Sequence, residues 1–205
     1  MSADLIGMLS GLLVFISAIP YCIRVYQGKI ETQITTWVLW TLIGLVLLLT
    51  YKSSGAGANV WPAVFGFINP LIITILTMRR LGRSGWVRPD RIEIACIVIS
   101  VISLGLWFRL SQDKGLVQFA LYLAILADLG ATTPTIKFVW KNPDRDRPFA
   151  WAMCAVAYGL AIFAITEHTF ANYVLPIWMF IGGMSIAFPL AIYRWRIRAR
   201  FTEWI

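Results

Sequence analysis

Charged residues are scarce in this chain, and their scarcity excludes an ordinary soluble domain. Only 14% of the 205 residues are charged, whereas soluble domains carry about 25%. So few charges cannot coat a water-facing surface. The hydrophobic content of 59% and the mean hydropathy of +0.74 are typical of an integral membrane protein instead.

Side chains suited to catalysis or metal binding are also few. The chain has one histidine, His168, and three cysteines that lie in or beside apolar runs without a CxxC spacing, so no metal site is predicted. No nucleophile–base pair and no glycine-rich nucleotide loop is visible. We therefore expect no enzyme and no cofactor. The first residues also lack the positive region of a cleaved signal peptide, so the first apolar run should remain in the protein.

Seven apolar runs divide the chain, and each can cross a bilayer if modest tilt is allowed. They cover residues 5–25, 36–51, 60–78, 92–108, 117–139, 149–165 and 173–193. The second, fourth and sixth runs are the shortest. The pattern predicts an all-α integral membrane protein with seven transmembrane helices, short loops and no separate soluble domain.

The basic residues alternate from one loop to the next. Fifteen of the 18 Lys and Arg lie in the loops after the first, third and fifth runs and in the tail, while Lys52, Arg109 and Lys114 lie on the other side. Short loops rich in Lys and Arg stay in the cytoplasm. This predicts an outside N-terminus and a cytoplasmic C-terminus, in what we expect to be a bacterial inner membrane. The net charge of +8 follows from topology and does not indicate nucleic acid.

A proline and a tryptophan recur at the same spacing in the two halves of the chain. Pro20 precedes Trp37 by 17 residues, and Pro134 precedes Trp151 by 17 residues. Each proline lies near the cytoplasmic end of an inward-running segment, and each tryptophan opens the segment that returns. The spacing indicates an internal repeat.

Two units of equal orientation need an odd number of helices between them. The fourth run supplies that inversion, so we expect a 3+1+3 parallel-repeat arrangement, which is a known transporter design. The predicted parts are residues 1–80 as the first three-helix repeat, 81–114 as the inverting linker helix, and 115–205 as the second repeat with a basic tail.

The segment from Pro20 and Tyr21 through a basic loop to Trp37 and Gly44 resembles the PQ-loop motif of the SWEET and PQ-loop superfamily. In that motif a helix ends in Pro-Gln, a basic loop follows, and a helix bearing Trp and Gly returns. Residues 134–151 look like a degenerate second copy. The chain is also similar to bacterial seven-helix proteins that share its Gly-Ala-Gly outer turn at 55–57. The resemblance implies a small-solute carrier, in a superfamily that also contains receptors.

Asp128 is the only acidic residue deep inside an apolar run. An Asp at the bilayer centre costs about 2.5–3.5 kcal/mol on insertion scales, so it should face the bundle interior. One interpretation is a site for a proton, a cation or a cationic ligand. The other is a structural hydrogen bond to a Ser, Tyr or Trp on a neighbouring helix. Thr132 should share its helical face.

Further polar and aromatic residues inside the runs are candidates for a substrate site. Together with Asp128 we expect Asn69, Trp40, Tyr158 and Tyr21 to line a cavity near the midplane. Gly7 and Gly11 form a GxxxG pair, for which helix packing is the expected role. Four prolines inside the runs are candidate hinges for alternating access: Pro20, Pro70, Pro134 and Pro189.

Two functions are compatible with these features. The first is a small-solute transporter that binds a small polar solute between two rocking repeats, with Asp128 as a candidate proton-coupling residue. The second is a non-transporting membrane component, namely a receptor, a lipid-binding protein or an auxiliary subunit. The basic tail at residues 194–200 is expected to contact anionic lipid headgroups. Assembly into a homo-oligomer is left open.

Overall fold

The computed structural model describes residues 2–28 and 32–205, and this part of the chain is built from α-helices and short 3-10 turns without strands. Lys29, one of the fifteen basic residues predicted to face the cytoplasm, lies outside the described residues. The helices are α1 (Ala3–Tyr26), α2 (Ile34–Ser53), α3 (Trp61–Leu81), α4 (Arg91–Leu110), α5 (Lys114–Lys141), α6 (Pro148–Ala161) and α7 (Phe170–Arg196). The 3-10 turns are η1 (Ala58–Val60), η2 (Gly82–Gly85), η3 (Ile162–Ala164) and η4 (Phe201–Glu203).

Six of the helices are long and apolar enough to cross a membrane by length and composition: α1, α2, α3, α4, α5 and α7. The prediction of an all-α membrane protein is therefore confirmed. The apolar helix covering α6 and η3, Pro148–Ala164, is shorter. It begins with Pro148, and proline is favoured there because the N–H groups of the first helical turn have no partner within the helix. It ends before Ile165, whose backbone is extended.

Polar side chains define where several helices begin. The Asp90 side chain accepts a hydrogen bond from the backbone of Glu93, and Glu93 bonds back to Asp90, which forms a capping box at α4. Asp113 caps α5 through the backbone N–H groups of Gly115 and Leu116. Such caps satisfy helix-end donors that have no partner within the helix. Asp90 and Asp113 therefore lie where two of the apolar runs start.

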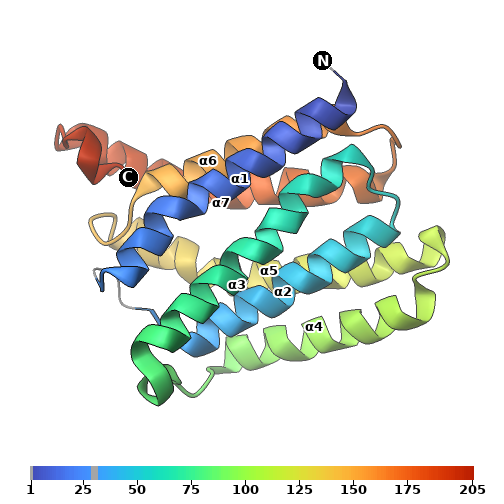
Figure 1. Cartoon of the computed structure of the whole chain (residues 1–205), viewed down its shortest axis with the longest axis horizontal. Coiled ribbons are helices and arrows are strands. Elements are labelled where there is room, and N and C mark those ends of the chain that lie inside the picture. Colours follow the sequence, from blue (N-terminus) through green and yellow to red (C-terminus); the bar gives the residue numbers. More distant parts are fainter. Residues whose placement is uncertain (1, 29–31) are drawn as a thin grey trace.

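The helices pack in the same order in the two halves of the chain. In the first half α1 packs on α3 and α3 packs on α2; in the second, α5 packs on α7 and α7 packs on α6. The halves meet where α1 contacts α6 and where α2 contacts α5. Helix α4 lies along α5 and α2 at the lower edge of Figure 1, while α1 and α6 lie at the upper edge.

Close approach of α1 to the start of α3 depends on two glycines. A Cβ atom placed on Gly7 would lie 2.1 Å from the carbonyl oxygen of Ala58, and one placed on Gly11 would lie 2.8 Å from the Cβ of Trp61. No side chain fits in this space. The predicted packing role of the GxxxG pair is confirmed.

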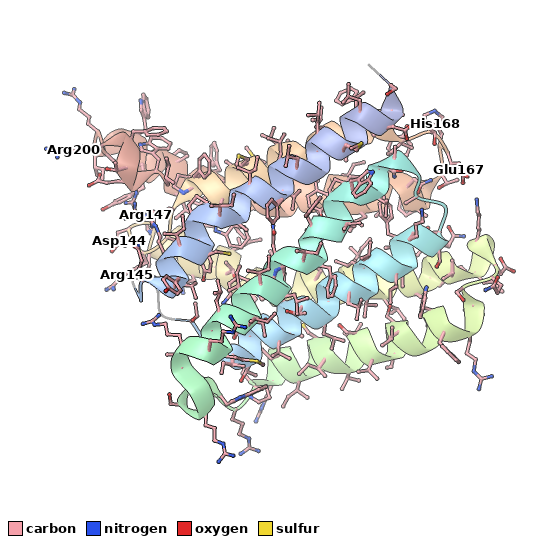
Figure 2. The ribbon with its side chains drawn as sticks, viewed as in Figure 1. Asp144, Arg145, Arg147, Glu167, His168 and Arg200 are labelled. Carbon is pink, nitrogen blue, oxygen red and sulfur yellow. The ribbon has the colours of Figure 1, made fainter. Side chains whose placement is uncertain are left out.

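Charged residues gather at the two ends of the helix bundle. Figure 2 shows Asp144, Arg145, Arg147 and Arg200 together at one end, and Glu167 with His168 at the opposite end. The chain termini also lie at opposite ends (Figure 1). The end with the α5–α6 loop and the tail is called the basic end below, and the other the Glu167 end.

Candidate functional site

Asp128 lies in the middle of α5 and is 3% exposed. The indole Nε1 of Trp178, on α7, donates a hydrogen bond to its Oδ2 at 2.7 Å. Thr132, one turn further along α5, is a second hydrogen-bond partner. The carboxyl therefore joins two helices of the second half of the chain. The sequence allowed a structural hydrogen bond between Asp128 and a Ser, Tyr or Trp on a neighbouring helix, and the bond with Trp178 is of this kind.

Tyr158 and Asn69 are polar groups at the contact between the two halves. The hydroxyl of Tyr158, on α6, donates to the carbonyl of Pro62 on α3 at 3.1 Å. Asn69, also on α3, donates through Nδ2 to the carbonyl of Val14 on α1 at 2.8 Å. Val14 and Tyr158 belong to one buried apolar cluster. These contacts connect both Asn69 and Tyr158 to Val14.

Asn69 also has an unpartnered acceptor. Its Oδ1 is buried and has no hydrogen-bond partner among the described residues. A buried amide oxygen without a donor is costly, and such groups in native proteins call for an explanation such as a ligand or a bound water. Asp128 is within electrostatic reach of Tyr158. Three of the five predicted site residues are therefore linked through Tyr158, Asp128 electrostatically and Asn69 through the cluster that contains Val14.

The other two predicted site residues lie apart from this group. The ring of Tyr21 packs against Trp37 in a tilted arrangement, with centroids 5.3 Å apart and an interplanar angle of 53°. Its electrostatic neighbour is Asp146 of the α5–α6 loop, so Tyr21 lies toward the basic end. Trp40 is half-buried on α2, and no contact recorded for the described residues joins it to Asp128, Asn69 or Tyr158. The expected sharing of one cavity by all five remains a prediction.

The candidate hinge prolines all lie inside continuous helices. Pro20 is in α1, Pro70 in α3, Pro134 in α5 and Pro189 in α7. Each removes a backbone hydrogen bond from the helix interior, which makes bending easier at that point. Their hinge role remains a prediction.

Two cavities lie away from Asp128. One, of about 270 Å³, is apolar and lies between α2 and α4. The other, of about 450 Å³, lies at the basic end beside the last turn of α7. Neither is lined by Asp128, Asn69 or Tyr158. In this conformation the central polar residues are packed against protein.

A polar network that the sequence did not reveal closes the Glu167 end. The hydroxyl of Tyr51, on α2, donates to the carbonyl of Asn172 on α7 at 2.8 Å and accepts a hydrogen bond from Asn59. Nδ2 of Asn172 donates to the carbonyl of Glu167 at 2.7 Å. The network joins the two halves of the chain. In the sequence, the one sign of this network is that Tyr and Asn residues stand among apolar neighbours, and this pattern does not indicate which residues pair.

Replacing Tyr51 with phenylalanine should lower the stability of the protein. The substitution removes a donor for Asn172 and an acceptor for Asn59 in a fully buried site, and losses of this kind cost about 1–3 kcal/mol. Tyr173→Phe is the matched control, because Tyr173 bonds only the exposed His168. Thermal unfolding in detergent measures the difference. Equal unfolding temperatures for the two variants would contradict the role assigned to the network.

Arginines hold the C-terminal residues against the basic end. Arg194 of α7 is only 7% exposed. Its Nε donates to the carbonyl of Glu203 and its Nη2 to the carbonyls of Asp144 and Asp146, each at 3.1 Å. Arg24 of α1 donates to the carbonyl of Ile205. The tail thus contacts both halves of the chain, and the predicted contact of its exposed residues with lipid headgroups remains a prediction.

Asp146 is the buried carboxyl of this end. It accepts hydrogen bonds from the backbone of Arg147 at 2.7 Å and from the indole of Trp151 at 3.0 Å. Burial raises the pKa of Asp146, although these bonds and the nearby guanidinium groups act in the opposite direction. The folded protein therefore holds this proton more tightly than the unfolded chain. Its contribution to stability falls as pH rises above the ordinary range of an aspartate.

The chemistry available at the centre is binding and proton exchange. One carboxyl, one phenol and one carboxamide gather there, and the described residues include no group of three or more His, Cys, Asp or Glu side chains that could hold a metal. The features that bear on function are the helix packing, the buried polar groups and the distribution of charge. No protein-family model, curated protein or solved structure matches the chain.

Proposed function

We propose that this protein is a small-solute membrane transporter of the SWEET/PQ-loop type, with two parallel three-helix repeats joined by an inverting helix and with the N-terminus outside. The observation that carries the proposal is the packing order. Helices α1, α3 and α2 pack in the same sequence as α5, α7 and α6, and α1 contacts α6 as α2 contacts α5. Repeated units of this kind are used by transporters to alternate access around a fixed central site.

The central site of the proposal lies where the two units meet. Tyr158 reaches from the second unit to the first, and the buried Oδ1 of Asn69 offers an acceptor that a solute hydroxyl or ammonium group can satisfy. Asp128 supplies a carboxyl within electrostatic reach of Tyr158. Polar groups at this depth are costly in a membrane and are associated with substrate or ion pathways. A small polar solute is the substrate class that fits them.

An efflux assay tests the proposal. Proteoliposomes are loaded with a defined mixture of hexoses, amino acids and polyamines, and the solutes that leave are measured by mass spectrometry. We expect at least one of them to leave faster than from protein-free liposomes. Efflux equal to that from protein-free liposomes for every solute in the mixture would contradict transport of these classes.

A steric variant localises the route. A Cβ on Gly66 of α3 would lie 2.6 Å from the hydroxyl of Tyr158, so Gly66→Val should slow the efflux of that solute. Gly105→Val on α4 is the control, because nothing lies within 4 Å of a Cβ placed there. If both variants transport at the rate of the native protein, the path does not run between α3 and α6.

The close packing around Asp128 and Tyr158 favours a second candidate function, that of a non-transporting membrane component. Two cavities lie away from Asp128, and the side chains of Asp128 and Tyr158 are buried. A receptor, lipid-binding protein or auxiliary subunit without a solute path would show such packing. Purification from native membranes followed by mass spectrometry distinguishes the two. A stoichiometric partner protein together with an absence of efflux would support this candidate over transport.

A further inference from the structure

The cavity at the basic end is lined by cationic and aromatic side chains. Its lining residues are Arg194, Trp195, Arg196, Arg198, Ala199 and Trp204. It forms because the chain turns back after α7, so that Trp204 comes to lie opposite the last turn of the helix. Its volume of about 450 Å³ falls within the range of roughly 300–1,000 Å³ common for small-molecule sites. We call it the arginine pocket.

Among the described residues, no salt bridge includes an arginine of this pocket. The salt bridges are Lys114–Glu167 and Arg145–Asp144. The side chains of Arg196 and Arg198 are exposed and make no hydrogen bond within the described chain. The neighbouring carboxyl of Asp146 interacts electrostatically with Arg194, and it also accepts a hydrogen bond from Trp151.

Arg194 is the buried part of the pocket. Its Nε and Nη2 donate to three backbone carbonyls, while Nη1 makes no bond with the described residues. A guanidinium carries five donors in a planar fork, and the two on Nη1 are left for another acceptor. The pocket thus contains a fixed, nine-tenths buried cation beside two exposed ones.

The backbone of the turn is left-handed at one pocket residue. Arg198 has φ of 51°, and among the described residues it is the one non-glycine residue with a positive φ. This left-handed residue closes α7: the N–H of Ala199 donates to the carbonyl of Arg194 at 3.0 Å, a pattern common at helix C-termini. The turn brings Arg198 to the same hollow as Arg194 and Arg196.

We propose that the arginine pocket binds the phosphate group of an anionic molecule. Guanidinium groups bind phosphate oxygens with paired hydrogen bonds, and three of them around one hollow repel one another until an anion enters. The surroundings favour a phospholipid headgroup as the source. Trp195 and Phe201 are about three-quarters exposed beside the arginines, and aromatic and basic residues just beyond a span are typical of the lipid interface.

Native mass spectrometry of the purified full chain tests the proposal. The protein is offered phosphatidylglycerol or phosphatidylcholine, and a double variant, Arg196→Gln with Arg198→Asn, is compared with it. Asparagine is chosen because it tolerates a positive φ. We expect retention of phosphatidylglycerol over phosphatidylcholine, and a loss on the order of tenfold or more in the double variant. Arg83→Gln with Arg88→Gln removes two exposed charges from another loop and should leave retention unchanged.

Two further arms complete the experiment. Inorganic phosphate that displaces the lipid at equal concentration would assign the pocket to a soluble phosphate, and Arg196→Lys with Arg198→Lys should keep most of the binding because charge is retained. An unfolding temperature equal to that of the native protein establishes that the Gln/Asn variant is folded. Equal retention by all variants, or equal loss in both charge-removing pairs, would overturn the proposal.

Discussion

Gly7→Ala is expected to destabilise the protein, although alanine is the better helix former. A Cβ at this position would lie 2.1 Å from the carbonyl oxygen of Ala58 and 2.7 Å from its carbonyl carbon. These atoms belong to the backbone of η1, which cannot rotate away as a side chain can. Asn59 holds this turn by accepting a hydrogen bond from Gly57 and donating one to Tyr51. Helix α1 must therefore move away from α3.

The expected loss exceeds the gain in helix propensity. Forcing additional atoms into a packed contact costs about 1–3 kcal/mol or more, and replacing glycine by alanine in a helix returns only about 1 kcal/mol. The free energy of unfolding in detergent, measured by denaturant titration, should fall. Gly105→Ala is the control because its Cβ meets nothing within 4 Å, and its stability should stay level or rise. If the two variants change alike, α1 and α3 do not pack as described.

The sequence predicts the features that depend on periodicity and local composition. Apolar runs locate the helices because about 20 apolar residues are needed to span a bilayer. The GxxxG pair at Gly7 and Gly11 indicates a packing face because small residues recur one turn apart. Asp128 stands out because a carboxyl inside an apolar run needs a partner. The type of partner, a tryptophan on a neighbouring helix, was among the alternatives that the sequence allowed.

Features that depend on contacts between distant segments could not be predicted. Arg194 looks like a cytoplasmic surface charge in the sequence, but the turn after α7 buries it against the carbonyls of Asp144, Asp146 and Glu203. Tyr51 meets Asn172 across 121 positions of the chain, and no local pattern encodes that pairing. For Trp40 and Tyr21, the sequence indicates a depth in the membrane and a shared face of their own helix, but it does not indicate which other helix that face meets. Depth does not specify which way a side chain points around its helix.

Asp128→Asn is expected to preserve the fold and to remove the pH dependence of solute efflux. The asparagine Oδ1 can still accept the hydrogen bond that Trp178 now donates to the carboxyl at 2.7 Å, so the contact between α5 and α7 survives. The amide, however, cannot take up or release a proton. If the protein transports as proposed and couples solute movement to this residue, efflux measured from mildly acidic to mildly alkaline pH should become independent of pH. Native protein and variant are compared with the solute identified in the mixture assay.

Trp178→Phe separates the structural role from the coupling role. Phenylalanine keeps much of the ring volume but removes the indole N–H, so the carboxyl of Asp128 keeps Thr132 as its partner and loses Trp178. Hydrogen bonds between membrane helices contribute on average about 0.6 kcal/mol and at most roughly 2 kcal/mol, and a loss within this range is expected. Trp195→Phe, at an exposed indole of the same helix, should change stability less.

The combination of the two variants decides between the interpretations of Asp128. If Asp128 serves only as a clamp, Asp128→Asn leaves both stability and the pH profile of efflux unchanged, and Trp178→Phe lowers stability alone. If it couples transport to protons, Asp128→Asn flattens the profile while the unfolding temperature stays the same. Because asparagine retains the acceptor and loses the titratable proton, a change in the pH profile without a change in stability has its cause in the proton itself.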